Sequence, residues 1–139
     1  MSVFEIFRDR WKNENLDVNP PVDAESIVRC FEQFGISPQQ DLLELYKTLN
    51  GKGCMDQEMF ELWPLARIEK ENSSEKERDR TKRFGVLFAD YSFSAWEYRI
   101  NSSGQVLIDY YDGKEPEIRG DSIKDFFELM LKDPDEVLL

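Results

Sequence analysis

The spacing of apolar residues changes near residue 59, and this change limits the chain to a fold in which helices and strands occupy separate stretches. Before it, apolar residues recur every three or four positions, as on one face of a helix. After it, residues 94–101 and 105–111 alternate, as in strands. This order predicts an α+β fold, with N-terminal helices packed on an antiparallel sheet and a C-terminal helix.

Two helices are expected before residue 36. The first covers about Val3–Glu14, where apolar residues recur at helical spacing. Pro20 and Pro21 then stop helix formation and give an extended link. Asp23 is a good N-cap for a second helix, which ends at Gly35.

A third helix is expected from Ser37 to Leu49, with signals at both ends. Ser37 and Gln40 fit a capping box, and Pro38 fits the first helical position. Asn50 and Gly51 fit a left-handed stop after the last turn. These signals predict a short helix with fixed boundaries.

The rest of the chain predicts strands followed by one helix. Four strands are expected, at Met59–Trp63, Phe84–Asp90, Ser94–Asn101 and Gln105–Tyr111. Residues 101–104 between the last two strands fit a hairpin turn. The last helix starts near Asp121 or Ser122 and ends at Pro134. We therefore expect a single domain over residues 1–139.

Residues 69–83 form the most charged segment, with five acids and six bases. Asp79 and Arg83 stand four apart with the acid first, which favours a solvated helix. A mobile loop is an equal alternative for such a polar stretch. In either case we expect the weakest order of the domain here.

Composition excludes several classes of function. There is no histidine, so the commonest general base and metal ligand is missing, and two cysteines do not make a disulfide framework or a zinc site. The net charge of −11 opposes binding to nucleic acid or anionic membrane and favours basic surfaces. Charged residues near the N-terminus argue against a signal peptide. We expect a soluble cytoplasmic protein with two free thiols and no cofactor.

Five sequence segments resemble motifs of the SUKH superfamily and occur in the same order as in that family. This family includes fungal cell-wall-synthesis regulators of the Smi/Knr type and many bacterial immunity proteins. The segments are Gly35–Gly51, Phe60–Leu65, Phe84–Asp90, Trp96–Val106 and Ser122–Phe127. The charged stretch 66–83 departs from the family pattern.

The resemblance implies a domain that binds another protein and catalyses no reaction. Many bacterial members of the family bind and block a toxin, often a nuclease. An immunity protein against a basic toxin is therefore the expected function. A regulatory or scaffold domain of the cell-wall-synthesis type, with no toxin partner, is the alternative. The sequence names neither the partner nor the oligomeric state.

Enzyme chemistry has a weaker basis in the residues. Asp90, Asp109 and Asp112 lie near strand ends and are the best candidates for a magnesium or acid–base site. Asp109 alternates onto an outer strand face, however, and Asp112 is a turn former. Serine catalysis lacks a histidine to activate the hydroxyl. We expect no metal site and no catalytic residue.

The candidate partner-binding residues are aromatic or acidic and lie between residues 91 and 117. Tyrosine and phenylalanine side chains left exposed are common interface anchors, and carboxylates suit a basic partner. The candidates are Tyr91, Phe93, Tyr111, Asp109, Asp112, Glu115 and Glu117. Trp96, Tyr98 and Tyr110 are expected in the core. Glu115 and Glu117 are expected in a solvated loop.

Overall fold

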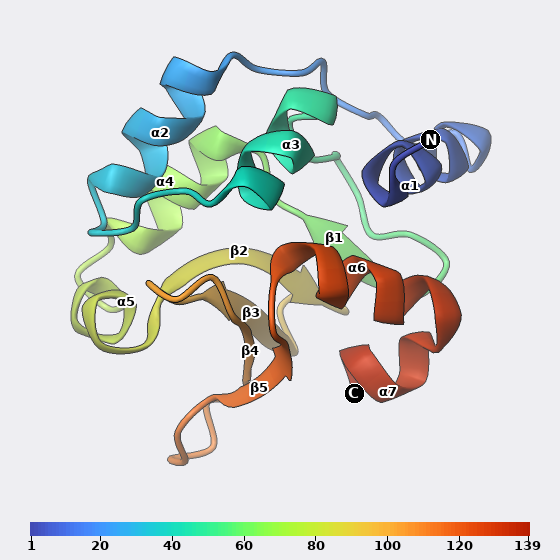
Figure 1. The fold of residues 1–139 in the computed structure, drawn as a ribbon. Coiled ribbons are helices and arrows are strands. Elements are labelled where there is room, and N and C mark those ends of the chain that lie inside the picture. Colours follow the sequence, from blue (N-terminus) through green and yellow to red (C-terminus); the bar gives the residue numbers. More distant parts are fainter.

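Seven helices and a five-stranded antiparallel sheet make up the protein, seen here in a computed structural model that describes residues 1–139 (Figure 1). The elements are α1 Val3–Asn13, α2 Ala24–Glu32, α3 Gln40–Thr48, β1 Phe60–Leu62, α4 Leu65–Asn72, α5 Arg78–Phe84, β2 Val86–Tyr91, β3 Trp96–Ile100, β4 Val106–Asp109, β5 Glu117–Gly120, α6 Ile123–Lys132 and α7 Pro134–Leu138. The predicted α+β class is confirmed. No helix is both long and apolar enough to cross a membrane.

Local capping explains where several helices begin. Ser2 and Glu5 form a capping box at the start of α1. The Asp23 side chain accepts a hydrogen bond from the backbone N–H of Ser26, as expected for α2. Ser122 caps α6 in the same way. Both cysteines are free thiols, as predicted.

The predicted boundaries of α3 are wrong at both ends. The helix begins at Gln40, and its N-cap is Gln39, whose side chain makes no capping hydrogen bond. That side chain donates instead to the carbonyl of Ser103 in the β3–β4 turn. Leu49 is already extended at the other end, with φ −160°. Tertiary contacts have therefore overridden the local capping signals.

The sheet order is β1-β2-β3-β4-β5, so every neighbouring pair is antiparallel and adjacent in sequence. Strand β5 was not predicted: Glu117 was expected in a solvated loop but starts this strand. Helix α7 was also missed. Pro134 follows the end of α6, as expected, but it also occupies the first turn of α7, which Asp133 caps.

One face of the sheet carries an aromatic core. Phe126 of α6 lies 5.4 Å from Tyr98 and 6.0 Å from Phe60 between ring centroids. Phe127 contacts Phe4 and Phe7 of α1, at 5.4 and 5.3 Å. Helices α1, α3 and α6 lie on this side of the sheet, and the β4–β5 loop extends away from them (Figure 1). These helices cover one face of the sheet, whereas α5 lies against the other face, where Arg80 bonds to Asp109 of β4.

The charged segment 69–83 is largely helical and partly buried. Asn72, Glu77 and Thr81 are each less than 5% exposed. The Asn72 amide donates to the carbonyl of Leu87, and Thr81 donates to the Asn72 side-chain oxygen. The helix alternative is thus observed, but one side of the segment packs on β2 and is not solvated. Its weak order remains a prediction.

The free side of β1 is covered by the loop before it. Lys52 N–H donates to the carbonyl of Leu62 at 3.0 Å, and Asp56 N–H donates to that of Phe60 at 2.9 Å. The Asp56 carboxylate also accepts from the Phe60 N–H and from the indole of Trp11. This edge of the sheet is therefore closed by hydrogen bonds from residues 52–56.

Candidate functional site

The predicted partner-binding residues come from two connections at the same end of the sheet. Glu97 of β3 faces Asp90 of β2 on one side and Asp109 of β4 on the other. The β2–β3 turn and the β4–β5 loop therefore leave the sheet at this end. We call residues 91–96 and 110–116 together the turn end.

The tip of the β2–β3 turn carries the most exposed aromatic side chain, Phe93, at 80%. Ser92, Phe93 and Ser94 all have positive φ, from 47° to 64°. This left-handed conformation costs about 1–2 kcal/mol per non-glycine residue. Ser92 N–H donates to the carbonyl of Met59 and Ser94 Oγ donates to Asp90, which hold the turn. The backbone is strained and Phe93 is presented to solvent.

Tyr91 supports this turn and is less available than predicted. Its ring stacks on Trp96 with centroids 4.6 Å apart and planes 3° from parallel. The Trp96 indole donates to the carbonyl of Leu138 at 2.8 Å. Tyr91 is therefore half-buried and not exposed as expected, because the stack ties the turn to α7.

Asp109 is fully buried, which contradicts its selection as a surface residue. It does lie on the strand face opposite the aromatic core, but α5 covers that face. Its carboxylate accepts hydrogen bonds from Arg80 at 2.7 Å and from Arg99 at 2.8 Å. Burial would raise the pKa of Asp109, but the bonds from these two guanidinium groups outweigh it and lower the pKa. Asp109 is thus a paired structural carboxylate.

Tyr111 lies between the protein surface and the buried ion pairs that Asp109 makes with Arg80 and Arg99. It is 37% exposed, and its hydroxyl lies 2.6 Å from a Glu97 oxygen and 2.9 Å from a Glu77 oxygen. A hydroxyl has one hydrogen, so it can donate to only one of these carboxylates at a time. Burial raises the pKa of Tyr111 and also that of Glu97. Tyr111 therefore positions α5 on the sheet besides showing one edge to solvent.

The remaining acidic candidates are exposed, as predicted. Asp112, Glu115 and Glu117 come from the β4–β5 loop and the start of β5. Glu115 makes one exposed ion pair, with Arg83 at 3.4 Å. Such pairs contribute little and exchange readily with other partners. Glu117 lies 3.9 Å from Arg119 in a second pair, and all three carboxylates remain accessible to a cationic surface.

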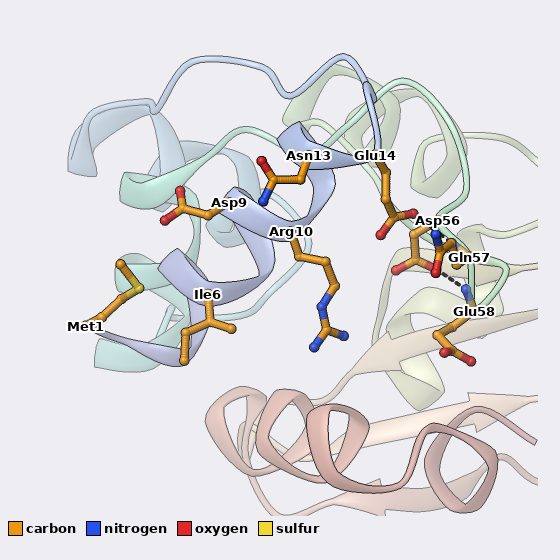
Figure 2. Close-up of a pocket in the computed structure, with 9 residues that line it drawn as sticks. All are labelled: Met1, Ile6, Asp9, Arg10, Asn13, Glu14, Asp56, Gln57 and Glu58. Carbon is orange, nitrogen blue, oxygen red and sulfur yellow. Dashed lines mark hydrogen bonds between the residues drawn. The ribbon is translucent and has the colours of Figure 1, made fainter.

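A large hollow lies elsewhere, between α1 and the turn at residues 56–58, with a volume of about 710 Å³ (Figure 2). Acids line it, with Arg10 extending from α1 into the space. The acids are Asp9, Glu14, Asp56 and Glu58. Sequence reasoning missed this hollow because its walls are more than 40 residues apart and carry no shared motif.

The hollow has few groups free for chemistry. Asp56 is 8% exposed, and its oxygens accept hydrogen bonds from Trp11, Glu58 and Phe60. Glu14 accepts from the Gln57 N–H. These carboxylates hold the loop in place.

The carboxylates named as candidates for a magnesium or acid–base site lie in three different environments. No group of three or more histidine, cysteine, aspartate or glutamate side chains is placed to hold a metal ion. Asp90 is buried and bound to Trp63 and Arg67, Asp109 is bound to two arginines, and Asp112 is exposed. The three candidate carboxylates are thus not brought together.

Sequence reasoning also missed two buried basic side chains. Arg99 is fully buried and binds Asp109 and Glu77, and Lys52 is 1% exposed. Arg99 alternates with the core residues Tyr98 and Ile100 of β3, and nothing in the sequence indicated that α5 covers its side of the sheet. No protein-family model matches the chain, and no curated protein matches it.

Proposed function

We propose that this chain is a cytoplasmic, non-enzymatic protein-binding domain of SUKH type, which neutralises a basic toxin domain such as a nuclease. The observation that carries the proposal is Phe93, 80% exposed on three consecutive residues of strained backbone. Strain of this kind is found where a surface is pre-organised for a ligand. An exposed aromatic side chain on a fixed turn suits an interface anchor.

The acidic surface supports the same function through long-range attraction. The chain carries a net charge of −11, and Asp112, Glu115 and Glu117 are exposed close to the turn end. A nuclease holds phosphates in a cationic groove, so an acidic partner can enter that groove and exclude the substrate. Long-range attraction of this kind also speeds association. Exposed charges are screened over about 8 Å at physiological salt, so salt should slow association.

The partner can be captured with the tagged chain from its native host and identified by mass spectrometry. The purified pair is then mixed in stopped flow over a salt series, and the toxin's nuclease activity is measured with and without the chain. We expect a basic partner, inhibition at equimolar ratio and an association rate that falls with salt. A scaffold assembly without a toxin, or an association rate independent of salt, would overturn the proposal.

Variants of the turn end test the site. Phe93→Ala should weaken binding about tenfold or more, as for an interface anchor, while Phe93→Leu should retain most of the affinity. Replacing Asp112, Glu115 and Glu117 by their amides should slow association. The matched control is Glu25→Gln, because Glu25 is exposed on α2, far from the β4–β5 loop (Figure 1). An equal effect at Glu25 would show that net charge, and not the turn end, attracts the partner.

A further inference from the structure

Strand β5 ends the sheet and is open on its outer side. It pairs only with β4. Beyond that pairing, no backbone or side-chain group of the protein makes a hydrogen bond to the backbone of residues 117–120. Unpaired N–H and C=O groups along a strand are a ready template for another strand. This edge can therefore accept one.

The opposite edge shows that the chain has a means of closing such a template. Lys52 and Asp56 N–H groups bond to the carbonyls of Leu62 and Phe60, so β1 is covered. No equivalent segment covers β5. The difference makes β5 the one edge of the sheet that is available for pairing.

A groove beside β5 adds apolar surface to the free backbone. It has a volume of about 490 Å³ and lies between β5 and α6. Ile118 and Leu129 line it and are 53% and 42% exposed. Exposed branched side chains next to a free strand edge give a place for an apolar side chain of the added strand.

The charges around the groove select the occupant. Three acids, Asp121, Asp125 and Glu128, line it against two bases, Arg119 of β5 and Lys132 of α6, so the lining is acidic by one charge. A second copy of the chain would bring the same acids and another net charge of −11 to this edge. Like charges brought together oppose association. A basic segment carries the opposite charge, so these acids attract it.

We infer that the β5 edge binds an extended basic segment of a partner protein by strand addition, with an apolar side chain over Ile118 and Leu129. The inference rests on the proposed function in one respect, that the partner is cationic. Basic side chains of the segment lie within reach of Asp121, Asp125 and Glu128. Main-chain hydrogen bonds supply affinity in this mode, and the groove supplies specificity.

A synthetic peptide tests the edge without knowledge of the partner. The full chain, labelled with ¹⁵N, is titrated with a blocked peptide of alternating lysine and valine, and separately with one of alternating glutamate and valine. We expect amide shifts at residues 117–120 and along α6 with the lysine peptide alone. Equal responses to both peptides, or no response at β5, would overturn the inference. Concentration-dependent shifts at β5 without peptide would indicate self-pairing and would overturn it too.

Ile118→Lys places a positive charge on the edge and should reduce affinity for the lysine peptide at least tenfold. Met59→Lys is the matched control, because Met59 is 44% exposed and directly precedes the closed strand β1. It should leave the affinity unchanged. An equal loss in both variants would show that added positive charge, and not the β5 edge, explains the effect.

The same variants separate this inference from the proposed function. If a captured toxin binds wild type and Ile118→Lys equally, the β5 inference fails while the proposed function stands. If no toxin is neutralised but the lysine peptide binds at β5, the proposed function fails while strand addition stands.

Discussion

The two edges of the sheet differ in how their backbone groups are satisfied. At β1, a loop supplies N–H donors to the carbonyls of Phe60 and Leu62, and Lys52 and Asp56 are buried to do so. At β5, the outer backbone groups have no hydrogen-bond partner in the protein, beside the half-exposed Ile118. Closing an edge requires polar groups to be buried, and each of them needs a partner. The difference indicates that stability depends on the closed edge, while the open edge is free to bind.

The largest expected effect is at Gly51, which starts the loop that closes β1. Its φ is +71°, and a Cβ there would lie 2.4 Å from the backbone nitrogen of Pro64. Gly51→Ala must therefore move backbone and should lower the free energy of unfolding by more than about 3 kcal/mol. Urea unfolding measures the loss.

Gly113 is the matched control, because it lies in the β4–β5 loop that leads to the open edge. Its φ is +84°, but no atom lies within 4 Å of an added Cβ. Gly113→Ala should cost only the left-handed strain, about 1 kcal/mol. Similar losses for the two glycines would show that the loop at β1 can move aside, and that the closed edge is not rigid.

The second effect concerns Asp56. Its carboxylate accepts hydrogen bonds from Trp11, Glu58 and Phe60, and the residue is buried. Asp56→Ala leaves these donors unpaired and should cost about 2–4 kcal/mol in urea unfolding. Asp112→Ala, in the exposed β4–β5 loop, should cost less than about 1 kcal/mol. The comparison fails if the two losses are alike.

Because of Lys52 beside the closed edge, the free energy of unfolding should depend on pH. Burial lowers its pKa to about 8, from 10.5 for a free lysine, although Asp56, Glu61, Cys54 and Glu14 favour the charge. Between these two pH values the unfolded chain binds one more proton than the folded chain. The Lys52 contribution to the free energy of unfolding therefore rises with pH across this window.

Lys52→Met removes that dependence. The free energy of unfolding of wild type, relative to this variant, should rise by on the order of 2–3 kcal/mol as pH goes from about 8 to 10.5. Chemical denaturation of both proteins at several pH values measures the difference. A constant difference would mean that Lys52 keeps an ordinary pKa in the folded chain.

The fold could be predicted where the signal was local. Asp23 and Ser122 cap helices as their sequence positions indicate, and the hairpin around residues 101–104 joins β3 to β4. Strand β5 could not be found in this way. Its four residues, Glu-Ile-Arg-Gly, have no clear alternation, and they are extended because β4 is there to pair with them.

The candidate site was predicted only in part, for a similar reason. Phe93 is exposed because it is at the tip of a turn, which the sequence indicated. Asp109 is buried because α5, about 25 residues earlier in the chain, covers its face of the sheet. Strand alternation identifies which residues share a face, but it does not say which faces a later or earlier helix covers. The acidic groove beside β5 depends on the same kind of long-range packing.

The smallest effect tests whether β5 is as open as its exposure indicates. Ile118 and Ile108 lie on adjacent strands, but Ile118 is 53% exposed and Ile108 is fully buried. Ile108→Val should cost about 1 kcal/mol in urea unfolding, as for a buried methylene. Ile118→Val should cost less than about 0.5 kcal/mol. An equal cost at Ile118 would mean that its side chain is packed in the free protein. The edge would then have little apolar surface to offer a partner strand, and Ile118 would belong with the residues that stabilise the fold.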